Sequence, residues 1–170
     1  MVFNLKGKMV VLRRLKKSDL NQLLDVGNNK LICKYMRFNY PFTQKQAKEL
    51  INSSRKHNQY VLGIELKEIN QIIGVITLRR INLKNKNAEI TIWTGKKYWK
   101  NGYSFEALNL LIRFAFYDLK LVKLWANVDS DNVASKTGII KAGFKQEGYL
   151  VKQIYYKNKW IDQLRFALLK

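Results

Sequence analysis

The chain is organised around the segment from Ala88 to Phe144, whose centre reads Tyr98-Trp99-Lys100-Asn101-Gly102-Tyr103-Ser104-Phe105-Glu106-Ala107. The residues before this centre, 88–94, are rich in β-branched and aromatic side chains, which predicts a strand. The residues after it repeat apolar side chains at helical spacing, which predicts an amphipathic helix. The expected buried face of that helix comprises Phe105, Leu108, Leu111, Ile112, Ala115, Phe116 and Leu119.

A strand, a basic loop with one glycine and a helix start are together suited to binding a phosphate group. The first N–H groups of a helix have no partner within the helix, and they lie at the positive end of its dipole. Gly102 would let the main chain approach a ligand closely, and Lys100 adds a positive charge. We therefore predict a pyrophosphate-binding loop from Lys100 to Ser104. An ordinary turn before a helix has the same local pattern, so that alternative stays open.

Two motifs make the interpretation more specific. The first comprises Ala88, Glu89, Ile90, Trp93, Tyr98, Trp99, Gly102, Tyr103, Glu106 and Ala107. The second comprises Asn132-Val133-Ala134-Ser135 and then Gly143-Phe144. In this order and at this separation, the two motifs resemble those of the GNAT acetyltransferases, in the branch similar to bacterial ribosomal-protein N-acetyltransferases. The resemblance extends more loosely from Met9 to the end of the sequence, and it implies acetyl-coenzyme A as a cosubstrate.

Four positions depart from the family's pattern. Lys100 stands where the family usually has a glycine, and Ser104 stands where it has an alanine. Ile139 occupies the position of a tyrosine that can protonate the departing thiolate in many members. Ile154 aligns with a glutamate that is a candidate base in the ribosomal-protein branch. The resemblance therefore carries over the fold and the coenzyme better than the acid–base roles.

We expect an α/β (α+β) fold with a mixed, mostly antiparallel central sheet of about seven strands and helices on both faces, in a single domain over residues 1–170. The expected order is one strand, three helices, three strands, a helix, a strand, a helix and two strands, which is the GNAT layout. Helix caps are expected at Ser18 or Asp19, at Thr43, and at Ser130 or Asp131. The resemblance also implies that the strands on either side of the main helix splay apart to admit the pantetheine arm.

The predicted coenzyme site comprises Ile92, Trp93, Thr94, Trp99, Lys100, Asn101, Gly102, Tyr103, Ser104, Asn127 and Asn132. As the resemblance implies, a main-chain N–H between Ile92 and Thr94 would stabilise the oxyanion. Asn132, assisted by Asn127, would hold the pantetheine amides.

Two residues are candidates for proton transfer. Glu89 is the candidate base, acting through a water molecule, and Ser135 is the candidate proton donor to sulfur. Each has a structural alternative: an ion pair with a nearby lysine for Glu89, and a hydrogen bond to the main chain four residues back for Ser135.

Several other residues have candidate roles that are weaker. Tyr35, Phe38, Tyr40 and Phe42 are candidates for one wall of an acceptor pocket, or for packing a helix against the sheet. His57, the only histidine, is better explained as a solvated residue at a helix end than as a catalytic group. With one histidine and one cysteine, Cys33, the sequence offers no ligand set for a metal.

The composition constrains partners more than fold. The formal net charge is +20, which favours acidic partners such as nucleic acid bound through charge, ribosomes, acidic proteins or the phosphates of coenzyme A. A compositional bias toward lysine is the alternative. No run approaches the roughly 18 apolar residues of a membrane span, and a single cysteine excludes an internal disulfide. We expect a cytoplasmic protein, as a monomer or homodimer.

Three functions remain open. The leading one is an acetyl-coenzyme A-dependent N-acetyltransferase that acts on a protein N-terminal amine, with a ribosomal protein as the type case; an amine with a pKa near 8 needs only modest help to react. The second is acetylation of a small amine, a polyamine or an aminoglycoside, although a chain at +20 would repel polycations. The third is an RNA- or ribosome-binding module with a vestigial coenzyme A site.

Overall fold

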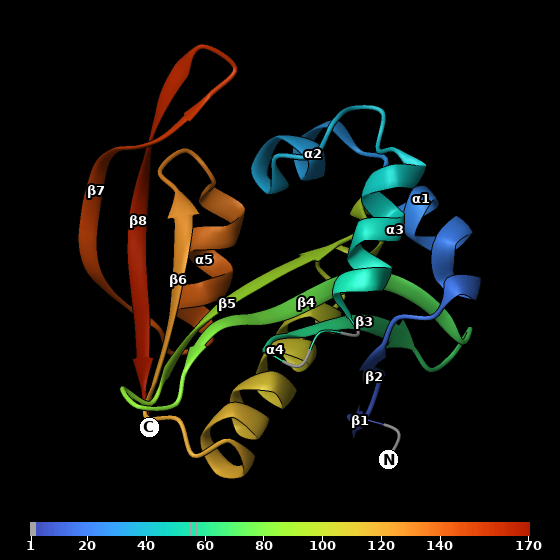
Figure 1. Ribbon diagram of the computed structural model, residues 1–170, viewed down its shortest axis with the longest axis horizontal. Helices are drawn as coiled ribbons and strands as arrows, with labels where there is room; N and C mark the ends of the chain where they lie inside the picture. Colours follow the sequence, from blue (N-terminus) through green and yellow to red (C-terminus); the bar gives the residue numbers. More distant parts are fainter. Residues whose placement is uncertain (1–2, 55, 57) are drawn as a thin grey trace.

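The computed structural model describes residues 3–54, 56 and 58–170 and is built around one eight-stranded sheet (Figure 1). Its strand order is β1-β2-β3-β4-β5-β6-β8-β7. All neighbouring strands are antiparallel except β5 and β6, which are parallel. The strands are β1 Asn4–Lys6, β2 Val10–Arg14, β3 Tyr60–Leu66, β4 Gln71–Asn82, β5 Asn87–Thr94, β6 Lys123–Asp129, β7 Lys145–Tyr156 and β8 Lys159–Leu169.

Five α-helices cover the sheet, namely α1 Leu20–Gly27, α2 Lys30–Met36, α3 Gln44–Ser53, α4 Tyr103–Arg113 and α5 Val133–Lys141. Short 3-10 helices precede α1 (η1, Lys17–Asp19) and α4 (η2, Lys96–Tyr98), and a π-helical segment (η3, Phe114–Asp118) continues α4. The expected GNAT layout is confirmed. One strand, β1, was not expected. It is only three residues long, so its sequence does not distinguish it from a loop, and it becomes a strand by pairing with β2.

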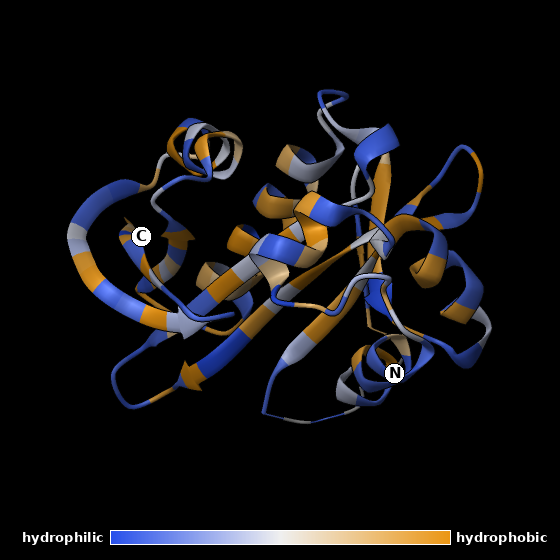
Figure 2. Cartoon of the chain, turned by 90° about the horizontal axis from the view of Figure 1, so that it is seen from above, coloured by the Kyte–Doolittle hydropathy of each residue, from blue (hydrophilic) through white to orange (hydrophobic). Residues whose placement is uncertain are grey.

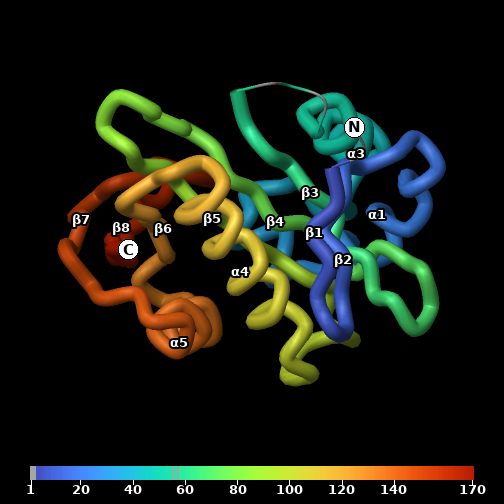
Figure 3. The backbone as a smooth tube through the Cα atoms, turned by 90° about the horizontal axis from the view of Figure 1, so that it is seen from below, coloured from blue at the N-terminus to red at the C-terminus, as the bar shows by residue number. Residues whose placement is uncertain are grey.

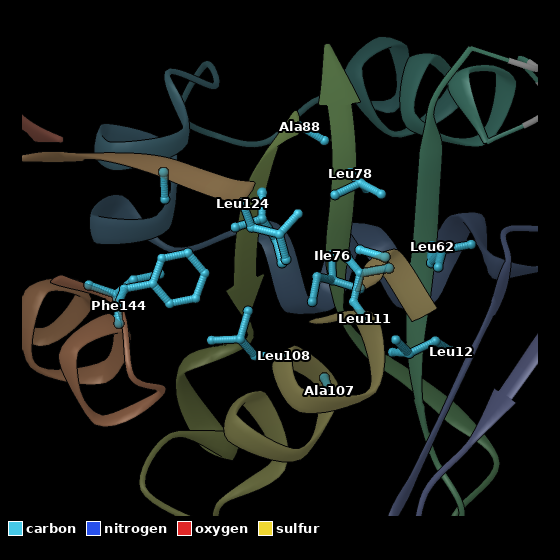
Figure 4. Close-up of a cluster of buried hydrophobic side chains, with 14 of the residues drawn as sticks. Leu12, Leu62, Ile76, Leu78, Ala88, Ala107, Leu108, Leu111, Leu124 and Phe144 are labelled. Carbon is cyan, nitrogen blue, oxygen red and sulfur yellow. The ribbon is translucent and has the colours of Figure 1, made fainter. Parts of the chain in front are cut away.

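The hydropathy colouring of Figure 2 changes from residue to residue along the strands. This alternation divides the apolar side chains between two cores. On β4, Ile76 and Leu78 face α4, whereas Ile72 and Val75 face α1 to α3. The α4 core contains the labelled side chains of Figure 4, from Leu12 and Leu62 on the sheet to Leu108 and Leu111 on the helix. Helices therefore cover both faces, as expected. Seen from below, α4 runs across the middle of the sheet (Figure 3).

One expected helix cap is confirmed: Thr43 caps α3, and its side chain and that of Gln46 bond each other's main-chain N–H groups. Three other details of the helices differ from expectation. Asn132, not Ser130 or Asp131, caps α5. The Asp19 carboxylate bonds Arg13 Nη1 at 2.8 Å and the Lys16 main chain instead of capping α1. Phe105 was expected on the buried face of α4 but is 38% exposed, with the Lys141 ammonium 5.5 Å above its ring.

The parallel strands β5 and β6 splay apart, as the resemblance implied. They pair only over Asn87–Glu89 and Lys123–Trp125, although β5 continues to Thr94 and β6 to Asp129. Figure 1 shows the two strands diverging from a common point. Beyond that point, the main-chain groups on the facing edges of both strands pair with no other strand of the described sheet. The opening between β5 and β6 is therefore the candidate place for a ligand to bind between the strands.

Candidate functional site

The loop between β5 and α4 is the segment for which the sequence predicts phosphate binding. Lys100 and Gly102 both adopt left-handed backbone conformations, with φ of 66° and 83°. The first bond of α4 runs from Glu106 N–H to the Gly102 carbonyl, and no side chain of the described residues caps the start of the helix. The N–H groups of the first turn are thus directed out of the helix end without a protein cap, at the positive end of the dipole.

Two hydrogen bonds join this loop to the end of β5. The Trp99 indole Nε1 donates to the Thr94 carbonyl at 2.8 Å, and the Thr94 and Ser104 hydroxyl oxygens are 3.0 Å apart. The predicted residues Thr94, Trp99, Gly102 and Ser104 are therefore brought together. Ile92 and Trp93 lie on the same part of β5, beyond its last pair with β6.

Glu106 fixes the other side of this helix end. It lies in the first turn of α4, and its carboxylate accepts hydrogen bonds from the main-chain N–H groups of Met9, at 2.9 Å, and Lys8. The turn between β1 and β2 is thereby bound to the start of α4. Sequence reasoning placed Glu106 in the motif but gave it no role, because its partners lie almost a hundred residues away.

The residues of the second motif lie at the start of α5. The Asn132 side-chain oxygen accepts from the Ser135 N–H at 3.2 Å, so it caps the helix and leaves only its amide N–H groups for a ligand. The half-buried Ser135 hydroxyl makes no hydrogen bond within the described part of the chain, so its expected structural alternative is not observed. Asn127, on β6, accepts a hydrogen bond from Arg165 on β8. Apart from the backbone of its own helix, no atom of the described residues lies within 4 Å of where a Gly138 Cβ would be.

Glu89 lies at the closed end of the splay, in the last residue pair of β5 with β6. It is 3% exposed, and its carboxylate accepts from Arg79 Nη2 at 2.8 Å and lies 3.4 Å from Arg80 Nε. A bulge in β4, where Arg80 has a φ of 51°, lets consecutive arginines face one carboxylate. Its ion-pair partners are thus arginines, not the lysine considered from the sequence, and a base role would run through water.

A cavity of about 680 Å³ lies between α2, the start of the β6–α5 loop and the distal half of the β7–β8 hairpin. In Figure 1, α2 faces that half of the hairpin across the top of the molecule. Phe38, Tyr40, Tyr156 and Trp160 supply its aromatic lining. The Phe38 ring also packs against the Trp93 ring, with centroids 5.9 Å apart, so the cavity adjoins the end of β5.

Two of the four aromatic residues considered for a pocket wall, Phe38 and Tyr40, line this cavity. Phe42 is instead buried against Phe38 and Trp93, where it packs the helices onto the sheet. The Tyr35 hydroxyl donates to the Asp131 carbonyl at 3.5 Å, at the rim. Some of these aromatic residues therefore line the cavity, and others pack the helices against the sheet.

The cavity carries both signs of charge. Its acidic residues are Asp129, Asp131 and Asp162, and its basic residues are Lys30, Lys34, Lys157 and Lys159. The Lys34 ammonium bonds Asp131 at 2.6 Å, which raises the pKa of Lys34. Hydrogen bonds from the Lys152 main chain and the Tyr149 hydroxyl lower the pKa of Asp162.

Asp129 is the buried carboxylate of this cavity. It is 6% exposed, and its Oδ1 accepts from Arg37 Nη2 at 2.7 Å and from Gln163 Nε2 at 2.8 Å. Sequence analysis did not single it out. The available signal was an acidic residue at the end of a buried strand, immediately before the second motif, but its partners come from α2 and β8 and could not be read from spacing.

No three His, Cys, Asp or Glu side chains among residues 3–54, 56 and 58–170 come together in a way that could hold a metal ion. The helices of that same part of the chain are all too short or too polar to cross a membrane. His57, considered as a solvated residue, lies outside the described residues.

Comparison with known proteins places the sequence in a family. The family model described as an acetyltransferase (GNAT) domain matches residues 9–145. An uncharacterized N-acetyltransferase of Bacillus licheniformis is 30% identical over 95% of this chain and 93% of its own length.

Two solved structures share the fold. The ribosomal alpha-N-protein acetyltransferase RimL has a TM-score of 0.88 at 19% identity, over 100% of this chain and 96% of that one. The spermidine N-acetyltransferase of Vibrio cholerae, in complex with CoA and spermine, has a TM-score of 0.81 at 24% identity, over 96% of both chains. At these identities the likeness shows the fold alone.

Proposed function

The chain belongs to the GNAT acetyltransferase family and is an acetyl-transferring enzyme, and from this premise we propose that it acetylates the N-terminal amine of a protein. The acceptor we favour is an acidic or ribosomal protein. Family membership favours an enzyme over the RNA-binding module with a vestigial coenzyme site. The acceptor is the finer part of the proposal, because relatives of this chain include spermidine N(1)-acetyltransferases as well.

The observation that carries the proposal is the splay of β5 and β6 beside an uncapped helix start. The main chain from Lys100 to Ser104, with Asn101 and Tyr103 between them, would hold the pyrophosphate of acetyl-coenzyme A. Unpaired main-chain groups of β5 and the Asn132 amide would hold the pantetheine arm. These donors fit the group because none of them has a hydrogen-bond partner on the side of the opening among residues 3–54, 56 and 58–170.

Acetyl-coenzyme A supplies the thioester carbonyl that the amine attacks. A main-chain N–H between Ile92 and Thr94 would stabilise the negative charge on the carbonyl oxygen; donors of this kind are typically worth a few kcal/mol. The unengaged Ser135 hydroxyl would give a proton to sulfur. Glu89, the base predicted from the sequence, would take a proton through water from the ammonium form of the amine, before the neutral amine attacks. Binding both substrates at the opening contributes through proximity.

The charge of the cavity supports a protein acceptor over a polycation. Four lysines and three aspartates line the cavity, so it has no excess of negative charge to attract several ammonium groups. A protein N-terminus brings one amine, followed by a chain that can be neutral or acidic. The buried Asp129 suits that amine, and the lysines at the hairpin suit an acidic chain behind it.

Spermidine is the second candidate, for a specific reason. Asp129, Asp131 and Asp162 line the cavity and supply counter-charges that a polyamine requires. The same fold is seen with spermine in the Vibrio cholerae structure.

Intact-mass measurement tests the proposal. The protein and acetyl-coenzyme A are incubated with neutral and acidic peptides bearing free N-terminal amines, with the same peptides blocked at the N-terminus, and with spermidine. We expect a 42 Da gain on the free peptides only. Acetylated spermidine with unmodified peptides would establish the second candidate, and no acetylation of any amine would refute both.

A further inference from the structure

Resting on the proposed function, we propose that Asp129 is a catalytic residue that contacts the acceptor amine and accepts its proton as the amide bond forms. Three observations carry this: the position of Asp129 on the splayed strand, the fixed orientation of its carboxylate, and its place in the wall of the cavity beside the opening.

Asp129 and Trp93 lie at matched positions on the two arms of the splay. The last pair of the junction is Glu89 with Trp125, and Asp129 and Trp93 each lie four residues beyond it. At about 3.3 Å per residue, both are roughly 13 Å from the closed end. Phe38 packs against the Trp93 ring and lines the same cavity as Asp129. The cavity therefore adjoins the mouth of the opening, with Asp129 in its wall.

The Asp129 carboxylate is held in one orientation. Arg37, the left-handed residue that ends α2, and Gln163, on β8, both donate to Oδ1. Within the described residues Oδ2 accepts no hydrogen bond, so one oxygen is fixed and the other is available. Burying a carboxylate is costly unless it is paired and hydrogen-bonded. Arg37 and Gln163 meet that requirement while leaving an acceptor atom for a ligand.

The other carboxylates near the opening are less suited to this role. Both oxygens of Asp162 accept hydrogen bonds, from the Tyr149 hydroxyl and the Lys152 N–H. Asp131 is paired with Lys34 and its side chain is 58% exposed. Glu89 lies at the closed end against two arginines and does not line the cavity. Asp129 alone among these combines burial, a lining position and an available oxygen.

Amide formation and proton transfer to Asp129 proceed together. The neutral amine donates a hydrogen bond to Asp129 Oδ2 and forms a C–N bond to the acetyl carbonyl carbon. The nitrogen becomes positively charged and acidic, and one of its protons moves to Oδ2. The carbonyl re-forms as the C–S bond breaks, sulfur leaves with the electron pair, and Ser135 or water protonates it and regains a proton from solvent. Asp129 then releases its proton to water. A carboxylate paired with Arg37 stabilises positive charge that exists only in the transition state and after it.

The experiment compares Asp129→Asn with wild type and with a matched control, Asp118→Asn, an exposed aspartate in η3 on the α4 side of the sheet. The acceptor is whichever probe wild type acetylates, the neutral peptide with a free N-terminus or spermidine. General-base contributions of about 100-fold or more are typical, so we expect a fall in kcat of that size for Asp129→Asn alone. Calorimetry should give unchanged affinity for coenzyme A and weaker binding of the acceptor to the coenzyme A complex.

Chemical rescue separates catalysis from structure. In Asp129→Gly, added formate should occupy the space beside Arg37 and restore turnover with saturation. The proposal is overturned if Asp129→Asn keeps kcat within about threefold of wild type, well below a general-base contribution, or if it loses coenzyme A affinity and thermal stability in parallel. Failure of wild type to acetylate any amine would instead refute the proposed function, so the two failures are distinguishable.

Discussion

At the scale of single residues, the backbone of the phosphate-binding loop gives the most direct prediction. Gly102 has a φ of 83°, and a Cβ there would have Met9 Cε, at 3.7 Å, as its one neighbour within 4 Å among the described residues. Gly102→Val is therefore strained by its backbone, at a cost of about 1–2 kcal/mol, although space remains for its Cβ. We expect its coenzyme A affinity, measured by calorimetry, to fall at least about tenfold as the strained loop reorients its N–H groups.

Lys100→Ala is the companion variant for this loop. The Lys100 side chain contributes charge, whereas the ligands of the phosphates would be main-chain N–H groups. Lys100→Ala should therefore weaken coenzyme A binding less than Gly102→Val does, and its effect should shrink as salt is added. Equal affinity of wild type for coenzyme A and for its pantetheine fragment would show that this loop binds no phosphate.

The Ser135 hydroxyl gives the second prediction. Since it makes no hydrogen bond within the described chain, Ser135→Ala removes no structural bond, and stability should be unchanged. We expect kcat to fall roughly tenfold or more, with little change in KM for acetyl-coenzyme A, because a proton donor acts in the transition state. Thr137→Val, which removes a hydroxyl from the exposed face of the same helix, is the control. Near wild-type turnover of Ser135→Ala would assign the proton transfer to water.

At the scale of elements, the bulge in β4 and the start of β5 form one ionic unit. Glu89 is buried between Arg79 and Arg80, whose side chains are 46% and 68% exposed. Glu89→Gln leaves both arginines without their counter-charge. Because solvent screens these arginines, we expect a loss of about 1–2 kcal/mol, seen as a fall in Tm of a few degrees.

Turnover of folded Glu89→Gln tests the role predicted from the sequence. A base acting through water should lower kcat and flatten the acidic limb of the pH–rate profile. Unchanged kcat together with the lowered Tm would limit Glu89 to the ion pair.

Elements with a local cause could be predicted from the sequence. The Thr43 cap depends on Gln46, three residues later, and the turn at residues 67–70 follows from the strands on either side. The prediction of Ser130 or Asp131 as the α5 cap was wrong, because Asn132 beside them is an equally good capping residue and only the helix geometry chooses among the three. The three residues of β1 are too few to show the alternation of apolar and polar side chains that predicts a strand.

At the scale of the whole molecule, the site could be predicted on its coenzyme side but not on its acceptor side. The coenzyme residues Thr94, Trp99, Gly102 and Ser104 lie close together in the sequence, so a motif reveals them. The acceptor cavity is assembled from α2, β6 and the β7–β8 hairpin, and more than eighty residues of sequence separate α2 from the other two. Arg37, Asp129 and Gln163 meet only after the sheet has formed, and no local pattern connects them.

The net charge of +20 gives the last prediction. If the charge serves an acidic partner, encounter is steered by a field that salt screens over about 8 Å at physiological ionic strength. Acetylation of an acidic protein should then fall steeply between low and moderate salt, while acetylation of a short neutral peptide with the same N-terminus should hardly change. Rates for both acceptors across a salt series at fixed pH test this. If the two rates depend on salt in the same way, the charge reflects a compositional bias toward lysine and not an acidic partner.

The splay has a consequence for how the protein behaves in solution. From Ile90 to Thr94 on β5, and from Ala126 to Asp129 on β6, each strand offers an edge that pairs with no other strand of the described sheet. Open strand edges recruit strands from other chains, which is the usual start of aggregation. The apoprotein should therefore precipitate sooner on storage or gentle heating than the protein kept with coenzyme A, whose pantetheine arm takes the place of a missing strand. The ligand then preserves the protein as well as serving its chemistry.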